Sequence, residues 1–600
     1  MAASTGDEAP EFPDPLERDL ASHSNADLSD GRIDPKDWAG GVPQYPAHAP
    51  SVRLGQRWVS GLWLIPIGIV ALVLGIAVAQ QLRTYQWMQD FLREYPGTSP
   101  DYVPSVTTGF PWWLRWQHFF NIIFNFMMFI IRAGLQILAD HPRLYVNSGS
   151  RPGTEWLRLR GAVPADRMDP DKAHEVWTAK DDSVALPKWL GIPGLRHSIG
   201  LARWWHFSFD LLWLINGGIF FILLFSTGQW QRLVPRSWDV LPNAMSTAVQ
   251  YASLDLPAND GFTNYNGLQL LAYFLTVFVA APLALITGLL QSPAIAGKLG
   301  LGAGALNRQV ARSIHFGVLS WMIFFIAMHT VMVWITGLLG NVNHITLGTN
   351  TDSWWAIVIY AGGMAIVVAL WAWASPFTIR HPRKVQRAGE FMVGWAKGLM
   401  EWWDPRSTYH EKDISTFFWP NGHLPDSPEY AHLKAGGFAD CRLRIDGLVD
   451  NPVELGFAEL KAMPKREQTT RHYCIQGWSG IAKWGGVAMR DLLELVHPLP
   501  NARWVVFYSY GAGPEGGLYY DCHKIENMRH ELTILAYEMN GQPLNESHGA
   551  PLRLRDEAEL GFKQVKWVRA VEFVASFEHL GGGHGGYNED QEFYGYRMPI

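Results

Sequence analysis

The chain is 600 residues long, which is enough for two or more domains with separate hydrophobic cores. Its formal net charge of −6 argues against nucleic acid as a partner and against an acidic, disordered protein. The three cysteines include no C-x-x-C pair, which excludes a disulfide framework, a zinc ribbon and a cysteine-ligated iron–sulfur cluster.

Apolar segments dominate the first half of the chain. Residues 1–50 precede them and are polar and acidic without the features of a signal peptide, so we expect a disordered cytoplasmic tail. Many of the 29 tryptophans then stand at the ends of segments of about 20 apolar residues, as in the interfacial belts of membrane helices. Six such segments exceed what a soluble domain needs, and they predict an all-α, six-helix transmembrane bundle over 51–380. The expected spans are 58–80, 114–138, 204–225, 266–290, 313–339 and 354–374.

Positive charge is unevenly distributed over the loops of this bundle. The loop between the second and third spans and the stretch after the sixth span are rich in Lys and Arg, whereas the loop between the fifth and sixth spans has neither. Basic loops stay on the cytoplasmic side of a membrane. We therefore expect a multi-pass membrane protein, in contact with lipid, with both termini and any C-terminal domain in the cytoplasm.

Four histidines fall within the expected spans, where a polar side chain indicates function. His315 and His329 are 14 residues apart on one helix, so they share a face and lie roughly 21 Å apart along the axis. The topology places His206 level with His315 near the inner face, and His118 level with His329 near the outer face. Neutral imidazole is a standard iron ligand, and two imidazoles leave iron no open position. The pairs predict two b-type haems that transfer electrons across the membrane.

An alternative interpretation is that these histidines are structural and bond across helices. Two level-matched pairs favour haem ligation, with Arg132 and Arg203 near the inner face as partners for the propionates. The remaining histidines of this half are expected to be solvated or interfacial: His141, His197, His344 and His381. The segment, including 177–207, resembles the membrane-bound di-haem cytochrome b domains of bacterial respiratory enzymes, which implies electron exchange with a quinone pool.

The pattern changes at about residue 413, after an expected linker at 381–412. Short segments that alternate apolar and polar residues are separated by turn residues, as in 441–447, 502–510 and 565–574. These segments predict an α+β, strand-rich soluble domain over 413–600. Its Gly-rich end is expected to be extended, wrapping chain or flexible chain.

Cys474 follows one of the expected strands and precedes a Gly–Trp turn, with an amphipathic helix expected to start near Val487. A thiolate at such a junction, beside backbone N–H groups and close to Lys483, is an accessible soft ligand for a metal. The alternative is a buried thiol that packs as a small hydrophobic group.

A basic cluster further along suits an anionic, phosphate-bearing cofactor, because Arg and Lys supply charge-assisted hydrogen bonds. The alternative is a solvated basic face of a strand. The cluster consists of His548, Arg553, Arg555, Lys563 and Lys566.

Three separated motifs occur in the C-terminal half: C-x-x-G-W-S from Cys474, H-G-x-P-x-R from His548 and G-F-K-x-x-K-W from Gly561. Together with FFWPNG at 417–422 they resemble the molybdenum domain of the sulfite oxidase family, most closely the bacterial methionine-sulfoxide-reductase branch. The resemblance implies a single molybdopterin without a nucleotide, with Cys474 as the thiolate ligand of molybdenum and the catalytic residue, and oxygen-atom transfer at the metal. It also implies that these residues hold the pterin and its phosphate: Asn421, Gly422, His548, Arg553, Gly561, Phe562, Lys563 and Lys566.

We therefore expect a membrane-bound molybdenum oxidoreductase that exchanges electrons with quinone or quinol through two haems. A quinol-linked reductase of an S- or N-oxide is favoured, with a small oxide or oxyanion as substrate. One alternative is a sulfite-type oxidase with reversed electron flow, which the sequence Gly477, Trp478, Ser479 disfavours because sulfite oxidases carry an Arg-bearing stretch there. Another is a haem conduit or sensor whose C-terminal half is a non-catalytic binding module. The oligomeric state stays open.

Overall fold

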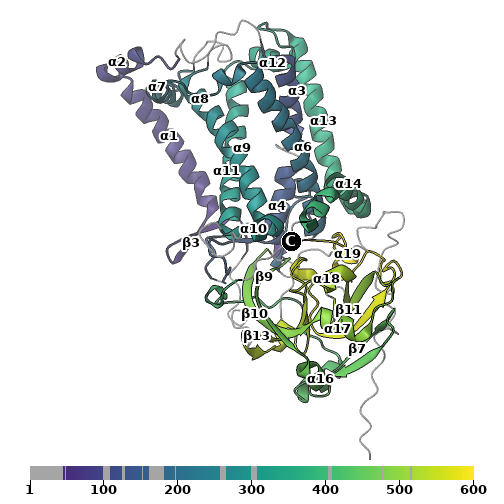
Figure 1. The fold of residues 1–600 in the computed structure, drawn as a ribbon. Helices are drawn as coiled ribbons and strands as arrows, with labels where there is room; N and C mark the ends of the chain where they lie inside the picture. Colours follow the sequence, from purple (N-terminus) through teal and green to yellow (C-terminus); the bar gives the residue numbers. More distant parts are fainter. Residues whose placement is uncertain are drawn as a thin grey trace, which may run out of the picture.

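A computed structural model describes residues 45–46, 49–98, 109–123, 129–151, 153–160, 182–195, 198–256, 265–298, 307–402, 409–475, 477–513 and 517–599. The chain forms two parts, a bundle of long helices and a strand-rich domain at one end of that bundle (Figure 1). Most of the expected N-terminal tail, residues 1–44, lies outside the described residues.

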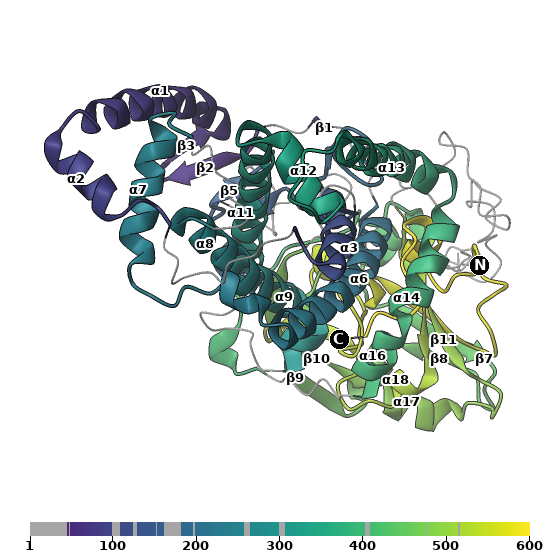
Figure 2. The same ribbon diagram turned by 90° about the horizontal axis from the view of Figure 1, so that it is seen from above.

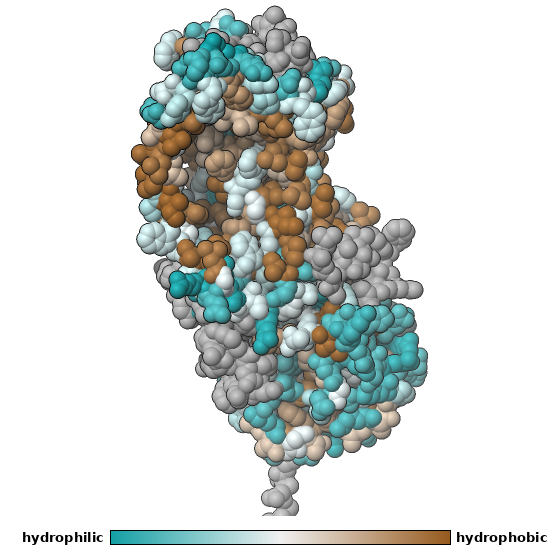
Figure 3. Space-filling view, turned by 90° about the vertical axis from the view of Figure 1, so that its left-hand side faces the viewer, coloured by the Kyte–Doolittle hydropathy of each residue, from teal (hydrophilic) through white to brown (hydrophobic). Residues whose placement is uncertain are grey.

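Several helices of the first part are long and apolar enough to cross a membrane. Among the described residues there are five: Gly61–Leu82, Ile199–Ser226, Gly267–Gln291, Arg308–Ile335 and Trp354–Arg380. Figure 3 shows brown, hydrophobic residues over the helical part and teal, hydrophilic residues at its far end and on the strand-rich domain. An apolar belt of this kind is consistent with association with a membrane.

The second expected span, 114–138, falls on two helices, α3 (Trp112–Asn121) and α4 (Ile130–Asp140). Residues 124–128 between them lie outside the described part, so the count of six spans stays a prediction. The other long elements are α1 (Leu64–Leu82), α6 (Ile199–Ser226), α8 (Gly267–Phe274), η7 (Leu275–Ala280), α9 (Ala281–Gln291), α11 (Arg308–Ile335) and α13 (Trp354–Arg380). Shorter helices are α2 (Gln86–Glu94), α7 (Val240–Ala252), α10 (Pro293–Lys298) and α12 (Leu338–Thr346).

Helix α11 has a central place in the bundle. Seen from above, α9 and α11 lie across from α3 and α6 (Figure 2). Its start is set by Asn307, whose side chain accepts hydrogen bonds from the backbone N–H groups of Gln309 and Val310. The first turn of α11 lies at the end of the bundle that meets the strand-rich domain, where Gln309 contacts Gly477.

Among its described residues, the strand-rich domain contains two sheets. One has the order β14–β13–β10–β9 with β15 beside β13, and the other has the order β12–β11–β16–β7–β8. The strands are β7 (Arg442–Gly447), β8 (Val453–Gly456), β9 (Lys465–Tyr473), β10 (Ser479–Ala488), β11 (Trp504–Ala512), β12 (Leu518–Lys524), β13 (Ile534–Met539), β14 (Gln542–Pro543), β15 (Arg553–Arg555) and β16 (Val568–Val574). Apolar side chains of both sheets, such as Leu535, Phe507 and Phe573, share one core. The three expected strand segments are thereby confirmed as β7, β11 and β16.

The amphipathic helix expected near Val487 is α17 (Met489–Val496), and the residues between the Cys474 turn and this helix form strand β10. The expected linker, 381–412, contains a 21-residue helix, α14 (Pro382–Trp402), which packs on α6 where Gly389 meets Trp204.

The C-terminal segment is not flexible chain: it is buried between the two parts. Arg383 donates to the backbone oxygens of Glu589 (2.8 Å) and Asp590 (2.6 Å), at helix α19 (Tyr587–Gln591). The indole of Trp204 on α6 donates to the carbonyl of Phe593 at 3.0 Å, and Phe593 is 1% exposed. Figure 1 shows this end of the chain at the junction of bundle and domain. The tail therefore ties the domain to the bundle.

Candidate active site

Cys474 lies in a tight turn between β9 and β10. The Cys474 N–H donates to the Trp478 carbonyl at 3.0 Å, and the Gly477 N–H donates to the Cys474 carbonyl at 3.1 Å. Gly477 has φ +82°, and a Cβ there would lie 2.8 Å from the His141 ring, so backbone and packing both require glycine. The Cys474 residue is 4% exposed.

Polar residues predicted for the cofactor gather around this thiol. Asn421 Nδ2 donates to Cys474 Sγ at 3.3 Å, and Lys566 Nζ donates to the Asn421 carbonyl. Arg553 Nη1 donates to the His548 carbonyl at 3.1 Å, and His548 Nε2 lies 3.2 Å from the Phe418 carbonyl. The neighbouring Gly422 adopts φ +95° against Trp567 and Lys566.

This cluster places two buried cations, Lys566 and Arg553, close to each other. Burial and the nearby Arg553 lower the pKa of Lys566 well below its usual value, while Cys474 opposes this shift. Burial and Arg555 lower the pKa of Arg553 to about 9. Neither cation forms an ion pair with a carboxylate of the described residues, and the Arg553 Nε has no hydrogen-bond partner there. A phosphate-bearing group would compensate both charges.

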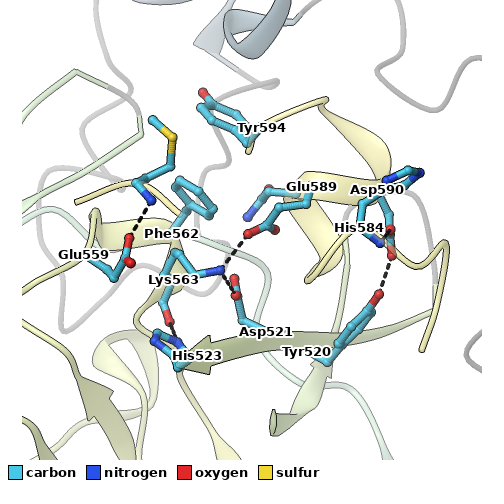
Figure 4. A network of polar contacts seen from close by, with 12 residues as sticks. Tyr520, Asp521, His523, Glu559, Phe562, Lys563, His584, Glu589, Asp590 and Tyr594 are labelled. Atoms are coloured by element: carbon cyan, nitrogen blue, oxygen red, sulfur yellow. Dashed lines mark hydrogen bonds and ion pairs between the residues drawn. The ribbon is translucent and has the colours of Figure 1, made fainter. Parts of the chain in front are cut away.

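The side chains of the Gly561–Lys563 turn lie in two different environments. Gly561 packs against the His472 ring, where a Cβ would overlap it, and Phe562 packs beside Tyr473. Both therefore lie close to the end of β9 and the Cys474 turn. The Lys563 side chain points elsewhere: its ammonium binds Asp521 and, at 2.7 Å, Glu589 (Figure 4). The backbone N–H of Lys563 donates to the Leu560 carbonyl.

Lys483 does not lie beside the thiol as expected. Its ammonium forms ion pairs with Glu411 at 2.8 Å and Glu467 at 3.0 Å. The two other cysteines, Cys441 and Cys522, are each 1% exposed within hydrophobic clusters.

The structure brings the four membrane histidines together in the two predicted pairs. The ring centroids of His206 and His315 are 6.4 Å apart, and those of His118 and His329 are also 6.4 Å apart. Helix α11 supplies one ring to each pair, while α6 and α3 supply the other two.

Groups behind the inner pair orient its rings. His206 Nδ1 lies 2.5 Å from Asp210 Oδ2, and His315 Nδ1 lies 2.9 Å from Thr287 Oγ1. With Nδ1 engaged, Nε2 is left for a ligand, and Gly134 leaves space beside the Nε2 of His206. Asp210 is one turn after His206 on the same helix, so this partner could have been found from the sequence.

Arg132 donates to the carbonyls of Trp371 (2.8 Å) and Gly191 (3.2 Å) and to the Ser375 hydroxyl (2.8 Å). These acceptors are uncharged, so its role beside a haem propionate stays a prediction. His141 and His344 are buried, with 6% and 2% exposure, so the expectation that they are solvated is wrong.

A family model described as "Oxidoreductase molybdopterin binding domain" matches residues 432–579. The Bacillus subtilis protein named "Uncharacterized oxidoreductase YuiH" is 31% identical over 164 residues, which cover 27% of this chain and 77% of that protein. The chain belongs to the molybdopterin oxidoreductases of the sulfite oxidase family.

Two further relatives carry names that refer to methionine-sulfoxide reductases. "Putative protein-methionine-sulfoxide reductase subunit YedZ1" of Azospira oryzae is 33% identical over 185 residues, 31% of this chain. "Protein-methionine-sulfoxide reductase catalytic subunit MsrP" of Xanthomonas campestris is 31% identical over 143 residues, 22% of this chain. The chain spans 64% of the first and 44% of the second.

The domain is thus an oxidoreductase domain whose cofactor is a molybdopterin. The residues present fit that group: a buried thiol suits the metal, and two buried cations without an acidic partner suit the phosphate. Sequence reasoning missed the residues that α11 and the loop after α4 bring to the Cys474 turn. Gln309 Nε2 donates to the Gly477 carbonyl at 3.0 Å, and the His141 ring packs on the same glycine.

Proposed function

We propose that the chain is a quinol-linked reductase of S- or N-oxides, with its molybdenum site on the cytoplasmic side of a bacterial inner membrane. The observation that carries the proposal is the course of helix α11. Its residue Gln309 binds the Cys474 turn at 3.0 Å, and the same helix carries His315 and His329. At about 1.5 Å per residue, His315 follows the contact by roughly 9 Å. One helix thereby connects the molybdenum turn with both histidine pairs.

Each histidine pair would ligate one b-type haem. Metal–nitrogen bonds to imidazole are about 2 Å long, so two rings on one metal have centroids about 6 Å apart. The separation of 6.4 Å in both pairs supports this assignment. Two imidazoles leave iron no open position, which suits electron transfer. Asp210 and Thr287 would hold the inner rings with Nε2 toward the iron.

The residues around Cys474 would hold the molybdopterin, which supplies two-electron oxygen-atom transfer when bound. Cys474 would give the metal a soft thiolate ligand, and the Asn421 amide would donate to that sulfur. Arg553 and Lys566 would pair with the phosphate. Burial lowers the pKa of His548 to about 3, so its ring is neutral and can hydrogen-bond the pterin without adding charge. Gly422, Gly561, Phe562 and the backbone of Lys563 would line the pterin.

The names of the relatives support reduction of an oxide. One relative is named as the catalytic subunit of a methionine-sulfoxide reductase and another as a subunit of such an enzyme. The substrate would be a small oxidised molecule, and the electrons would come from quinol one at a time through the haems.

Anaerobic absorption spectra of the haems test the proposal, using the full chain purified in detergent with its cofactors. Dithionite-reduced protein receives methionine sulfoxide or trimethylamine N-oxide, and oxidised protein receives sulfite. Reoxidation by an oxide in the wild type, lost in Cys474→Ala and kept in Cys441→Ala, is the expected result. Reduction by sulfite would instead indicate an oxidase. If neither the oxides nor sulfite change the haem spectra of protein that contains molybdenum, the proposal is contradicted and a conduit or sensor is favoured.

The haem assignment has its own test. His118→Leu and His206→Leu should each lower the haem content per chain to half of the wild-type value, because each variant removes one ligand from one pair. His344→Leu is the matched control, since His344 is 2% exposed and lies outside both pairs. An unchanged haem content in both pair variants would contradict the assignment.

A further inference from the structure

A hollow lies where the helical bundle meets the molybdenum domain. The space between its walls, including the open solvent at its mouth, is about 380 Å³. The bundle half contributes His141, Arg143, Tyr145 and Arg312 to its walls, and the molybdenum domain contributes Gly477 and Trp478. The hollow is therefore formed jointly by the two halves.

Arg312 brings an uncompensated charge to this hollow. Its guanidinium is held in place by two backbone carbonyls, that of His141 at 2.7 Å from Nη2 and that of Arg143 at 3.1 Å from Nη1. It forms no ion pair with any carboxylate in the described ranges. Carbonyl oxygens orient a guanidinium but do not neutralise it, and Arg312 is half-buried, so its uncompensated charge carries a desolvation cost. An anionic ligand would offset that cost.

The other lining residues leave the hollow positive. Burial lowers the pKa of Arg143, but Asp182 at 2.5 Å has the opposite effect, and the net pKa lies above the usual value. Arg143 is therefore a cation. Two guanidiniums thus share the walls with one carboxylate, Asp182. Burial also raises the pKa of Tyr145, so its phenol is neutral and can donate a hydrogen bond.

The hollow adjoins the cysteine turn. Gly477 lies in its wall, and the Gly477 N–H donates to the Cys474 carbonyl at 3.1 Å. Trp419 also lines it, two residues before Asn421, whose amide donates to Cys474 Sγ. A ligand in the hollow would therefore lie beside the residues proposed to hold the metal.

We propose that this hollow binds an anionic group of the substrate, a carboxylate or an oxyanion, and that Arg312 of the bundle determines this preference. The inference rests on the proposed oxide reductase function and adds the charge of its substrate. Arg312 is a specificity residue, because the oxide itself would react at the molybdenum site. The bundle then selects the substrate in addition to delivering electrons.

A matched pair of substrates tests the proposal in the cofactor-loaded full chain. N-acetylmethionine sulfoxide carries a carboxylate, and its primary amide carries none, while the sulfoxide is the same. In the wild type the acid should have the lower KM. Arg312→Gln should raise the KM for the acid about tenfold, the loss of one charge-assisted hydrogen bond, and change the KM for the amide less than twofold. The kcat should change little for both.

Four controls separate this role from others. Arg312→Lys keeps the cation and should retain part of the preference, and Arg387→Gln removes an exposed arginine of α14 away from the hollow. Molybdopterin and haem contents, measured for each variant, should stay at wild-type levels, which excludes the pterin phosphate and the haem propionates as the anion that Arg312 binds. Calorimetric titration with inorganic sulfate should give binding that Arg312→Gln weakens.

The outcomes distinguish this inference from the proposed function. If Arg312→Gln changes the KM for acid and amide equally, or leaves both unchanged, or lowers cofactor content, the inference is overturned. If no oxide reoxidises the haems but sulfate binding depends on Arg312, the anion site stands and the reductase function fails. If turnover occurs and the wild type binds no sulfate and does not prefer the acid, the function stands and the anion site fails.

Discussion

Lys563 and Lys566 belong to one short motif, yet the structure gives them different surroundings, and substitution should separate their roles. Lys563 Nζ is buried with Asp521 and Glu589, at 1% side-chain exposure for the lysine and 0% for both acids. Lys566 Nζ instead binds the Asn421 carbonyl next to Cys474. Lys563→Met should therefore destabilise the fold, whereas Lys566→Met should weaken the cofactor site.

The magnitude follows from the cost of an unpaired buried charge. Removing one partner of a buried ion pair costs about 3–5 kcal/mol, because the remaining charge stays buried without compensation. For a domain of this size each kcal/mol shifts the unfolding midpoint by about 2–4 °C, so Lys563→Met should lower it by roughly 6–20 °C. Lys566→Met should lower the pterin content with a smaller change in the midpoint of the remaining apoprotein.

The pH dependence gives a sharper check of the same reasoning. Burial and the neighbouring Glu589 raise the pKa of Asp521, and Lys563 opposes that shift. Without Lys563, Asp521 should take up its proton at higher pH in the fold than in the unfolded chain, so the variant gains relative stability as pH falls. The difference in unfolding midpoint between wild type and Lys563→Met should be smaller at pH 5 than at pH 7.

The assay is thermal unfolding of the full chain in detergent at a fixed scan rate, together with the pterin content of each variant. A Lys563→Met protein with the wild-type midpoint and a low pterin content would refute the reasoning. It would mean that Lys563 serves the cofactor rather than the ion network.

Three further substitutions have defined expectations. Gly477→Ala should lower the free energy of unfolding by about 1 kcal/mol for the left-handed backbone and by about 1–3 kcal/mol more for the contact with His141. Gly437→Ala, at φ +61° with open space around it, should cost only the backbone part. Equal unfolding midpoints for the two variants would contradict the packing argument. Burial raises the pKa of Asp590 to about 6, so this carboxyl stabilises the fold below its unfolded pKa, and the contribution is lost as pH rises through about 6. Asp590→Asn should therefore flatten the pH dependence of the unfolding midpoint in this range. An unchanged slope would contradict the raised pKa. Asp210→Asn should raise the midpoint potential of one of the two proposed haems in a redox titration, because a neutral amide makes the His206 ring a weaker electron donor to the iron. Two unchanged potentials would argue against His206 as an iron ligand oriented by Asp210.

The sequence by itself determined the features that depend on local pattern. Five of the six expected spans are long apolar helices among the described residues, and the strands β7, β11 and β16 lie where alternation placed them. The period of the helix and the order of the spans were enough to place His206 with His315 and His118 with His329. The motifs around Cys474 and His548 identified the family because their residue order is written directly in the chain.

Only the tertiary structure decided which residues of the two halves meet. The motif could not show that Lys563 and Lys566, three residues apart, reach different surroundings, since that depends on where Asp521 and Glu589 lie. Nor could it show that Arg312 and His141 reach the Cys474 turn, more than 150 residues further along the chain. Helix and strand patterns arise from neighbours within a few residues. Contacts between a bundle and a domain arise from the packing of complete surfaces, which no local pattern encodes.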